Sequence, residues 1–141
     1  MNSKPLQSAL IACLACLAAV PPAAARSKAA QWLVGEALKE ACGKGGTIDD
    51  SGVIERDLDG DGPADLIIAH DAVQCPAGPS ATCGNQVCAV KIYLRRGSLL
   101  EEFIATRGSA VKVGTGSPPP ISMRLEGGGE VTARWDGQTF R

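Results

Sequence analysis

The 141-residue chain carries 14 basic and 15 acidic residues, for a formal net charge of −1. This balance, without clusters of Lys and Arg, argues against a nucleic-acid-binding surface. The length fits one ordinary domain after removal of a short leader. Aromatic residues make up only 4% of the chain, so its core must consist mainly of aliphatic side chains.

The first 25 residues have the three-part pattern of a secretory signal peptide. Lys4 precedes an apolar run over residues 9–20, Pro21 and Pro22 then break any helix, and small residues end the segment at Ala25. We expect cleavage after Ala25, which leaves residues 26–141 as a single globular domain. This pattern predicts a periplasmic or secreted protein.

A lipid anchor is the alternative reading of the same segment. Leu10-Ile11-Ala12 before Cys13 resembles a bacterial lipobox, so Cys13 is a candidate for lipidation. The apolar run is too short to cross a bilayer, which takes about 20 residues. We therefore expect no transmembrane span in either case.

Four cysteines follow the leader: Cys42, Cys75, Cys83 and Cys88. An even number in an exported chain favours two disulfides. The spacing suggests that two of the last three close a loop and that the third reaches Cys42, but three pairings remain open. A zinc site is less favoured, because no C-x-x-C pair remains and His70 is the only histidine.

The segment after the leader, "SKAAQWLVGEALKEACGKGG", has apolar residues at helical spacing. Ser27 is a candidate N-cap, and Gly43 suits a left-handed stop. Trp32 is expected to pack against the core. The pattern predicts one N-terminal helix.

The remainder changes to the two-residue period of strands. Strands are predicted over residues 53–56, 65–70, 87–95, 99–105, 109–113 and 121–127. The terminal "EVTARWDGQTFR" predicts a hairpin whose two turn residues are Asp136 and Gly137. The predicted fold is α+β, with one helix packed on a mainly antiparallel meander and disulfide staples.

Between the first two strands lies "RDLDGDGPADLII", residues 56–68, with four aspartates in nine positions. Ca²⁺ takes six to eight oxygen ligands, and alternate residues of a tightly wound loop can direct carboxylates at one point. Gly62 permits the sharp turn, and a proline carbonyl keeps its acceptor capacity. The predicted calcium ligands are Asp57, Asp59, Asp61, Pro63 and Asp65.

Two other readings of this loop are weaker. In an acidic turn without an ion, four carboxylates would repel one another, although Asp and Gly favour turns in their own right. An EF-hand would place a glutamate where Ile68 stands, and it would have helices on both sides. Mg²⁺ is disfavoured because it takes fewer protein ligands.

The nine loop residues resemble the D-x-D-x-D-G-x-x-D calcium loop of FG-GAP repeats in extracellular propellers. Only one copy is present, whereas a propeller needs several blades, so the resemblance implies the metal loop and not the propeller. A wider resemblance joins this loop to Cys42, the "C-x7-C-G-x3-C" cysteines and the closing "RWDGQTF" segment. This wider resemblance is to a group of small exported alphaproteobacterial proteins, and it implies no particular activity.

No catalytic residues are predicted. His70 and Asp71 are adjacent on a predicted strand end and should point to opposite faces, and the serines lack a nucleophile-elbow context. We therefore expect a small exported calcium-binding domain, acting as a binding or structural module with an unknown partner in the envelope or outside it. The alternative is a small periplasmic hydrolase or a hydrolase inhibitor.

Overall fold

The computed structural model describes residues 25–141. The predicted leader, with Cys13, lies outside the described residues except for Ala25. Among the residues that the structure describes, no helix is long and apolar enough to cross a membrane.

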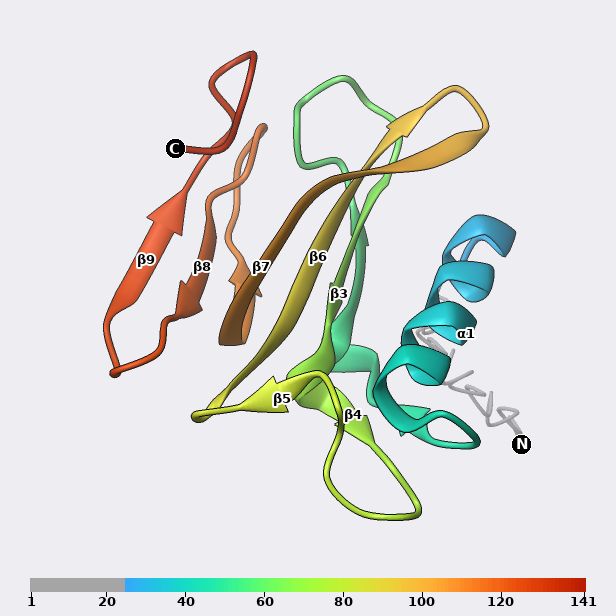
Figure 1. The fold of residues 1–141 in the computed structure, drawn as a ribbon. Helices are drawn as coiled ribbons and strands as arrows, with labels where there is room; N and C mark the ends of the chain where they lie inside the picture. The colour runs from blue at the N-terminus through green and yellow to red at the C-terminus, as the bar shows by residue number, and fades with distance from the viewer. Residues whose placement is uncertain (1–24) are drawn as a thin grey trace, which may run out of the picture.

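One helix packs on a mostly antiparallel sheet, which confirms the predicted α+β class (Figure 1). The regular elements, with η for 3₁₀ turns, are α1 (Lys28–Cys42), β1 (Thr47–Ile48), η1 (Asp50–Gly52), β2 (Val53–Arg56), β3 (Asp65–Ala69), η2 (His70–Ala72), β4 (Val73–Gln74), β5 (Cys83–Gly84), β6 (Val87–Arg96), β7 (Leu99–Val113), β8 (Ile121–Arg124) and β9 (Glu130–Ala133).

The main sheet has the strand order β2-β3-β6-β7-β8-β9, with β5 paired to β6. All neighbouring strands run antiparallel. Strands β1 and β4 form a separate two-stranded ribbon. The long connection from β3 to β6 contains β4 and β5, and it projects at the lower end of the molecule in Figure 1.

Both ends of α1 follow the sequence signals. The hydroxyl of Ser27 accepts a hydrogen bond from the Ala30 amide at 3.2 Å, which satisfies one of the free donors at a helix start. Gly43 adopts a φ of 70°, and its amide donates to the Lys39 carbonyl. That backbone conformation favours glycine, so the helix ends where the sequence predicts.

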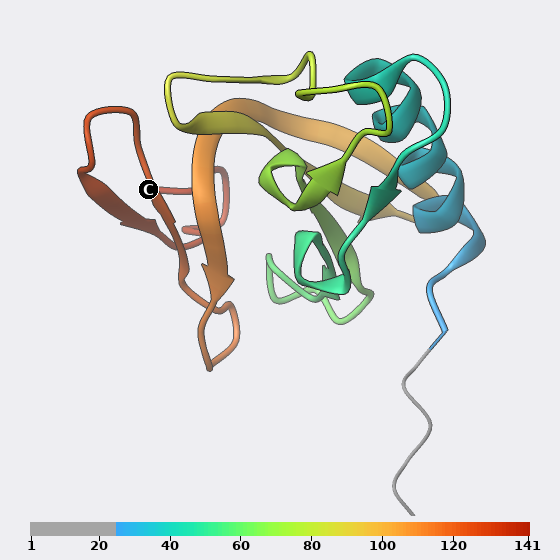
Figure 2. The ribbon, with the colours of Figure 1, turned by 90° about the horizontal axis from the view of Figure 1, so that it is seen from below.

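The two faces of the sheet bury two separate apolar clusters. On one face, α1 covers Leu66, Ile68 and Tyr93. On the other face, the β8–β9 segment and the loop leucine, Leu58, cover Ile67, Val90 and Ile92 among others. Figures 1 and 2 show α1 and the β8–β9 hairpin on opposite sides of the central strands. The buried strands therefore read as continuous apolar runs, as "LIIA" does in β3.

The predicted strands 99–105 and 109–113 are one strand, β7, which pairs with β6 over its first part and with β8 over its last. The register shifts between Ser109 and Lys112, and Ala110 has a φ of 52°. Gly108 lies so close to β8 that an added Cβ would meet the Met123 sulfur at 2.8 Å. The sequence pattern left residues 106–108 between two predicted strands, whereas Gly108 lies at a bend within one strand.

Two further expectations were wrong. Trp32 is 66% exposed instead of packed into the core, because the apolar stripe of α1 follows Ala30, Val34 and Ala37. The terminal turn is shifted by one residue: Asp136 and Thr139 pair across Gly137 and Gln138. The Asp136 carboxylate accepts hydrogen bonds from the backbone amides of Gln138 and Thr139. Asp136 therefore caps the turn as the residue just before its two central positions.

The two predicted disulfides are present, as Cys42–Cys75 and Cys83–Cys88. The first joins the last residue of α1 to the segment after β4. The second links Cys83 of β5 to its register partner in β6. The sequence left three pairings open, and the structure selects this one.

Candidate metal centre

The aspartate loop connects β2 to β3 at the upper end of the sheet in Figure 1. The last register pair before it joins Arg56 to Asp65. Gly60 and Gly62 have φ values of 82° and 106°, which residues with a side chain adopt only with strain. These two glycines let the loop wind tightly enough to bring alternate side chains together.

Three of the predicted ligands lie together. Asp57, Asp59 and Asp61 each offer a carboxylate oxygen, and these oxygens lie within 4.8 Å of one another. The side chain of Asp59 is 5% exposed and that of Asp61 is 44% exposed. Such a group of oxygen atoms could hold a metal ion, and hard cations such as Ca²⁺ and Mg²⁺ prefer oxygen ligands.

The loop orients these carboxylates with its own backbone. Asp57 accepts hydrogen bonds from the amides of Gly60 at 2.7 Å and Gly62 at 2.9 Å, one to each oxygen. One oxygen of Asp59 accepts from the Asp61 amide at 3.1 Å. Each carboxylate oxygen has about two lone-pair sites, so these bonds leave capacity for a cation.

Sequence reasoning missed one charged residue at the site, Arg96, which ends β6. Its guanidinium donates to Asp59 at 2.9 Å and lies 3.5 Å from an oxygen of Asp61. A signal for this contact existed in the pairing of β3 with β6, since Leu66 is opposite Tyr93. That register places the end of β6, and so Arg96, beside the loop. The contact could be predicted only if the strand order were known.

The charges at the site shift three ionisation equilibria. Burial tends to raise the pKa of Asp59, but the hydrogen bond and charge of Arg96, together with hydrogen bonds from Asp61, outweigh burial and hold this pKa below its ordinary value. Desolvation and the neighbouring Asp59 carboxylate raise the pKa of Asp61. The contact with Asp59 also raises the pKa of Arg96. The guanidinium therefore acts as a counter-charge within the acidic group.

Asp65, another predicted ligand, lies outside the three-carboxylate group and is fully buried. One of its oxygens accepts from the Leu58 amide and the other from the Arg95 amide, both at 2.7 Å. Burial raises the pKa of Asp65, and these two amides partly offset that effect. Asp65 thereby ties the loop to β6. Pro63, the remaining predicted ligand, is exposed in the loop.

Leu58 fixes the loop from its inner side. Its side chain is fully buried, although an aspartate precedes it and another follows it in the sequence. It packs in the apolar cluster with Ile67 and Ile121. Burying a leucine stabilises a fold by about 1.5–3 kcal/mol, so the loop is anchored independently of its charges.

His70 and Asp71 lie in the 3₁₀ turn η2, not at the end of a strand as the sequence predicts. The His70 ring is buried and its Nδ1 lies 2.8 Å from the Thr82 hydroxyl. The Asp71 carboxylate accepts from the Ala110 amide at 2.8 Å. These two side chains therefore serve different contacts, one to the β4–β5 connection and one to the bend of β7.

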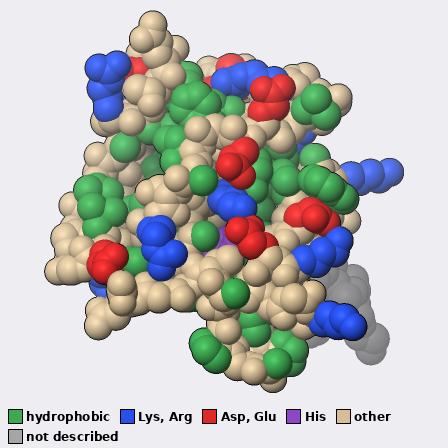
Figure 3. Space-filling model, viewed as in Figure 1, with side chains coloured by type: hydrophobic (Ala, Val, Ile, Leu, Met, Phe, Trp, Pro, Cys, Tyr) green, Lys and Arg blue, Asp and Glu red, His purple; other side chains and the backbone are tan. Residues whose placement is uncertain are grey.

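Charges elsewhere do not gather by sign on the face that Figure 3 shows, where acidic and basic side chains alternate across the surface. The aspartate loop is the one place among residues 25–141 where three potential metal-binding side chains lie together. This site, and not a similarity of the whole fold to another protein, is the basis for assigning a function. Comparison with protein-family models, curated proteins and solved structures finds no match to this chain.

Proposed function

We propose that the loop over residues 57–65 binds Ca²⁺ and that the protein is a small exported calcium-binding module. It acts as a binding or structural component of the envelope or the extracellular space. The observation that carries this proposal is the convergence of the Asp57, Asp59 and Asp61 carboxylates within 4.8 Å. A divalent cation there offsets the repulsion between these groups.

The chemistry of the ligands favours calcium among divalent ions. The donors are carboxylates without thiolate or imidazole, which suits a hard cation better than zinc or copper. The Asp65 carboxylate and the Pro63 carbonyl complete the ligand set in this proposal, as the resemblance to FG-GAP loops implies. Both Asp65 oxygens already accept one amide, and each retains a second lone-pair site for the ion.

Two features support export. The two disulfides are of a kind that forms and persists in oxidising compartments. The signal-like leader precedes α1 directly. In this proposal calcium binds with the submillimolar-to-millimolar affinity typical of extracellular modules, where the ion is abundant.

Isothermal titration of the chelator-treated protein with calcium tests the proposal. We expect one saturable site, with binding abolished in the double variant Asp59→Asn, Asp61→Asn. Glu126→Gln serves as the matched control, because it removes one exposed acidic charge in the β8–β9 turn, away from the loop. Absence of binding heat at millimolar calcium, in a protein whose far-UV spectrum is that of the folded chain, would defeat the proposal.

A hydrolase inhibitor is the second candidate. The observation that favours it is the projecting β4–β5 connection, whose residues 76–79 are exposed and lie between two disulfide-bonded cysteines. An exposed loop whose two ends are covalently fixed has less conformational entropy to lose on binding a cleft. Inhibition assays against a panel of proteases and peptidoglycan hydrolases distinguish this candidate, with Pro79→Ala and Ala77→Asp as loop variants. Under this candidate, Ala77→Asp relieves the inhibition.

A further inference from the structure

His70 occupies a site that the calcium proposal does not use. It begins η2 directly after β3, and its side chain is fully buried. Its Nδ1 lies 2.8 Å from the Thr82 hydroxyl, while its Nε2 has no hydrogen-bond partner among the described residues. A buried ring nitrogen without a partner has a free-energy cost in native proteins. This arrangement is therefore sensitive to the protonation state of the ring.

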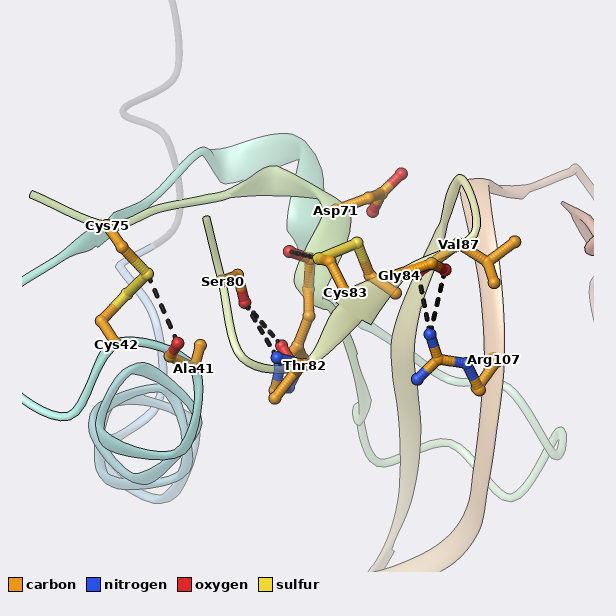
Figure 4. The surroundings of a disulfide bond; sticks show 12 residues. Ala41, Cys42, Asp71, Cys75, Ser80, Thr82, Cys83, Gly84, Val87 and Arg107 are labelled. Atoms are coloured by element: carbon orange, nitrogen blue, oxygen red, sulfur yellow. Dashed lines mark hydrogen bonds between the residues drawn. A yellow bond between two sulfur atoms is a disulfide. The ribbon is translucent and has the colours of Figure 1, made fainter. Parts of the chain in front are cut away.

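Thr82 belongs to a loop whose ends are covalently fixed. We define the bracketed loop as residues 75–83: Cys75 is bonded to Cys42 of α1, and Cys83 is bonded to Cys88 of β6. Between these bonds, residues 76–79 are exposed and Thr82 is buried (Figure 4). The loop can therefore detach in its middle without leaving the molecule.

Few polar contacts hold the middle of the bracketed loop. The Thr82 hydroxyl bonds to His70 and lies 2.8 Å from the Ser80 hydroxyl. The backbone contacts are the Ala81 amide to the Ala41 carbonyl at 2.8 Å, and the Ala89 amide to the Thr82 carbonyl at 2.9 Å. His70 is thus the side chain on the body of the protein that binds the buried end of this loop.

Protonation of the ring is unfavourable in the closed structure for a geometric reason. A neutral imidazole has one donor and one acceptor nitrogen, so it can bond Thr82 and leave a lone pair at Nε2. The imidazolium has two donors, and its Nε2–H would be buried without an acceptor. The charged groups facing it are Glu40 from α1, Lys91 from β6 and Asp71 from η2. Glu40 is already paired with Lys91 at 2.6 Å.

The net electrostatic effect disfavours the imidazolium in the closed structure. Burial lowers the pKa of His70 below its ordinary value of 6.5, Lys91 lowers it further, and Glu40 and Asp71 only partly oppose this. Opening the loop gives the ring access to water, where its pKa returns toward the ordinary value. Acid therefore favours the open form, because only that form accommodates the proton without penalty.

We propose that His70 is an acid-sensitive latch, which holds the bracketed loop at neutral pH and releases residues 76–82 below about pH 6 while both disulfides retain its ends. Because the closed form has a lowered pKa at His70 and the open form the ordinary one, the open population rises by up to about 30-fold between pH 7.5 and pH 5.0. The released residues include the exposed segment 76–79, and the proposal is independent of calcium binding.

Hydrogen exchange of single amides by NMR, corrected for the intrinsic pH dependence of exchange, tests the latch in the untagged protein. The Ala81 and Ala89 amides report loop opening, and the Ile104 amide in the β6–β7 ladder reports global unfolding. We expect the opening constant at Ala81 and Ala89 to rise by up to about 30-fold from pH 7.5 to pH 5.0, with a much smaller change at Ile104. An equal change at all three amides, or none at Ala81, overturns the proposal.

His70→Asn supplies the matched variant, since its amide can reach Thr82 but does not titrate. In this variant the opening constant should be independent of pH. If the variant does not fold, titration of the imidazole in the unaltered protein decides the matter, because His70 is the only histidine. A folded-state pKa at or above 6.5 would contradict the latch, and a pKa below it, with pH-dependent exchange at Ala81, would support it.

Discussion

Asp65 differs from the other aspartates of the loop in what it binds within the protein. Its carboxylate is buried and accepts the Leu58 and Arg95 amides, so it joins the loop to β6. Asp59 and Asp61 instead face Arg96 near the surface. One acidic motif therefore contains a buried residue that supports the fold as well as carboxylates that lie nearer the surface.

The first prediction concerns Asp65→Asn, measured by chemical unfolding in the presence of chelator. An amide side chain can accept only one of the two backbone donors and leaves the other buried without a partner. We expect the free energy of unfolding to fall by about 2–3 kcal/mol. Asp59→Asn is the control and should change it by less than about 1 kcal/mol. Equal losses in the two variants would contradict the structural role of Asp65.

The second prediction concerns Arg96→Gln and calcium affinity. The guanidinium occupies oxygen atoms that the proposed ion also needs, so its removal makes the site more negative. We expect calcium to bind about two- to fivefold more tightly, as fits the strength of a partly exposed ion pair. Arg107→Gln is the control. The native Arg107 side chain donates to the carbonyls of Gly84 and Val87, at the end of β6 opposite to Arg96. Unchanged or weaker binding to Arg96→Gln would show that the guanidinium does not compete.

At this scale the sequence identifies the acidic loop, but not its surroundings. The spacing of Asp57, Asp59 and Asp61 and the intervening glycines is local information, and local geometry brings these side chains together. The contacts of Arg96 and Asp65 cross from one strand to another. They depend on strand order and register, which a single sequence does not specify.

Among the elements, those with strong local signals were predicted well. α1 has a cap at Ser27 and a glycine stop at Gly43, and both function as expected. β7 was predicted as two strands, residues 99–105 and 109–113, whereas in the structure it continues through Gly108, which lies close to Met123. The terminal turn was misplaced by one residue, because Asp136 can either occupy a turn or cap it. In each of these two errors, a tertiary or side-chain contact overrode a local preference.

The third prediction compares the two disulfides as elements of the fold. Cys42–Cys75 spans 33 residues and Cys83–Cys88 spans five. Chain-entropy arguments give about 3.7 kcal/mol for the longer loop and about 2 kcal/mol for the shorter. Replacing Cys42 and Cys75 with Ala should therefore lower the free energy of unfolding by about 1.5 kcal/mol more than replacing Cys83 and Cys88. Unfolding curves of the two double variants check this, and the reverse order would contradict it.

Over the whole molecule, one sheet supports two apolar clusters, and the proposed metal loop lies at one end of both. The helix side contains Leu66 and Ile68 and the opposite side contains Leu58 and Ile67. The C-terminal segment closes the second side with an aromatic group, in which the Trp135 ring lies 5.3 Å from Phe103 and 5.1 Å from Phe140. The change from a helical to a two-residue period along the sequence predicted the α+β class. It did not predict where the C-terminal segment packs.

This arrangement links the loop to global stability. The loop joins β2 to β3, and Asp65 extends the link to β6 in the centre of the sheet. A ligand that binds the native loop and not the unfolded chain stabilises the entire domain. We therefore predict that calcium raises the unfolding temperature of the complete fold, including the aromatic group of the C-terminal segment.

Thermal unfolding in chelator and in calcium is the measurement that tests this account most directly. At a calcium concentration about 100 times the Kd, binding adds about 2.7 kcal/mol, which corresponds to a rise in Tm of roughly 5–10 °C for a domain of this size. The variant Asp59→Asn, Asp61→Asn should show no rise. If the unaltered protein melts at the same temperature in chelator and in about 10 mM calcium, the calcium site is contradicted.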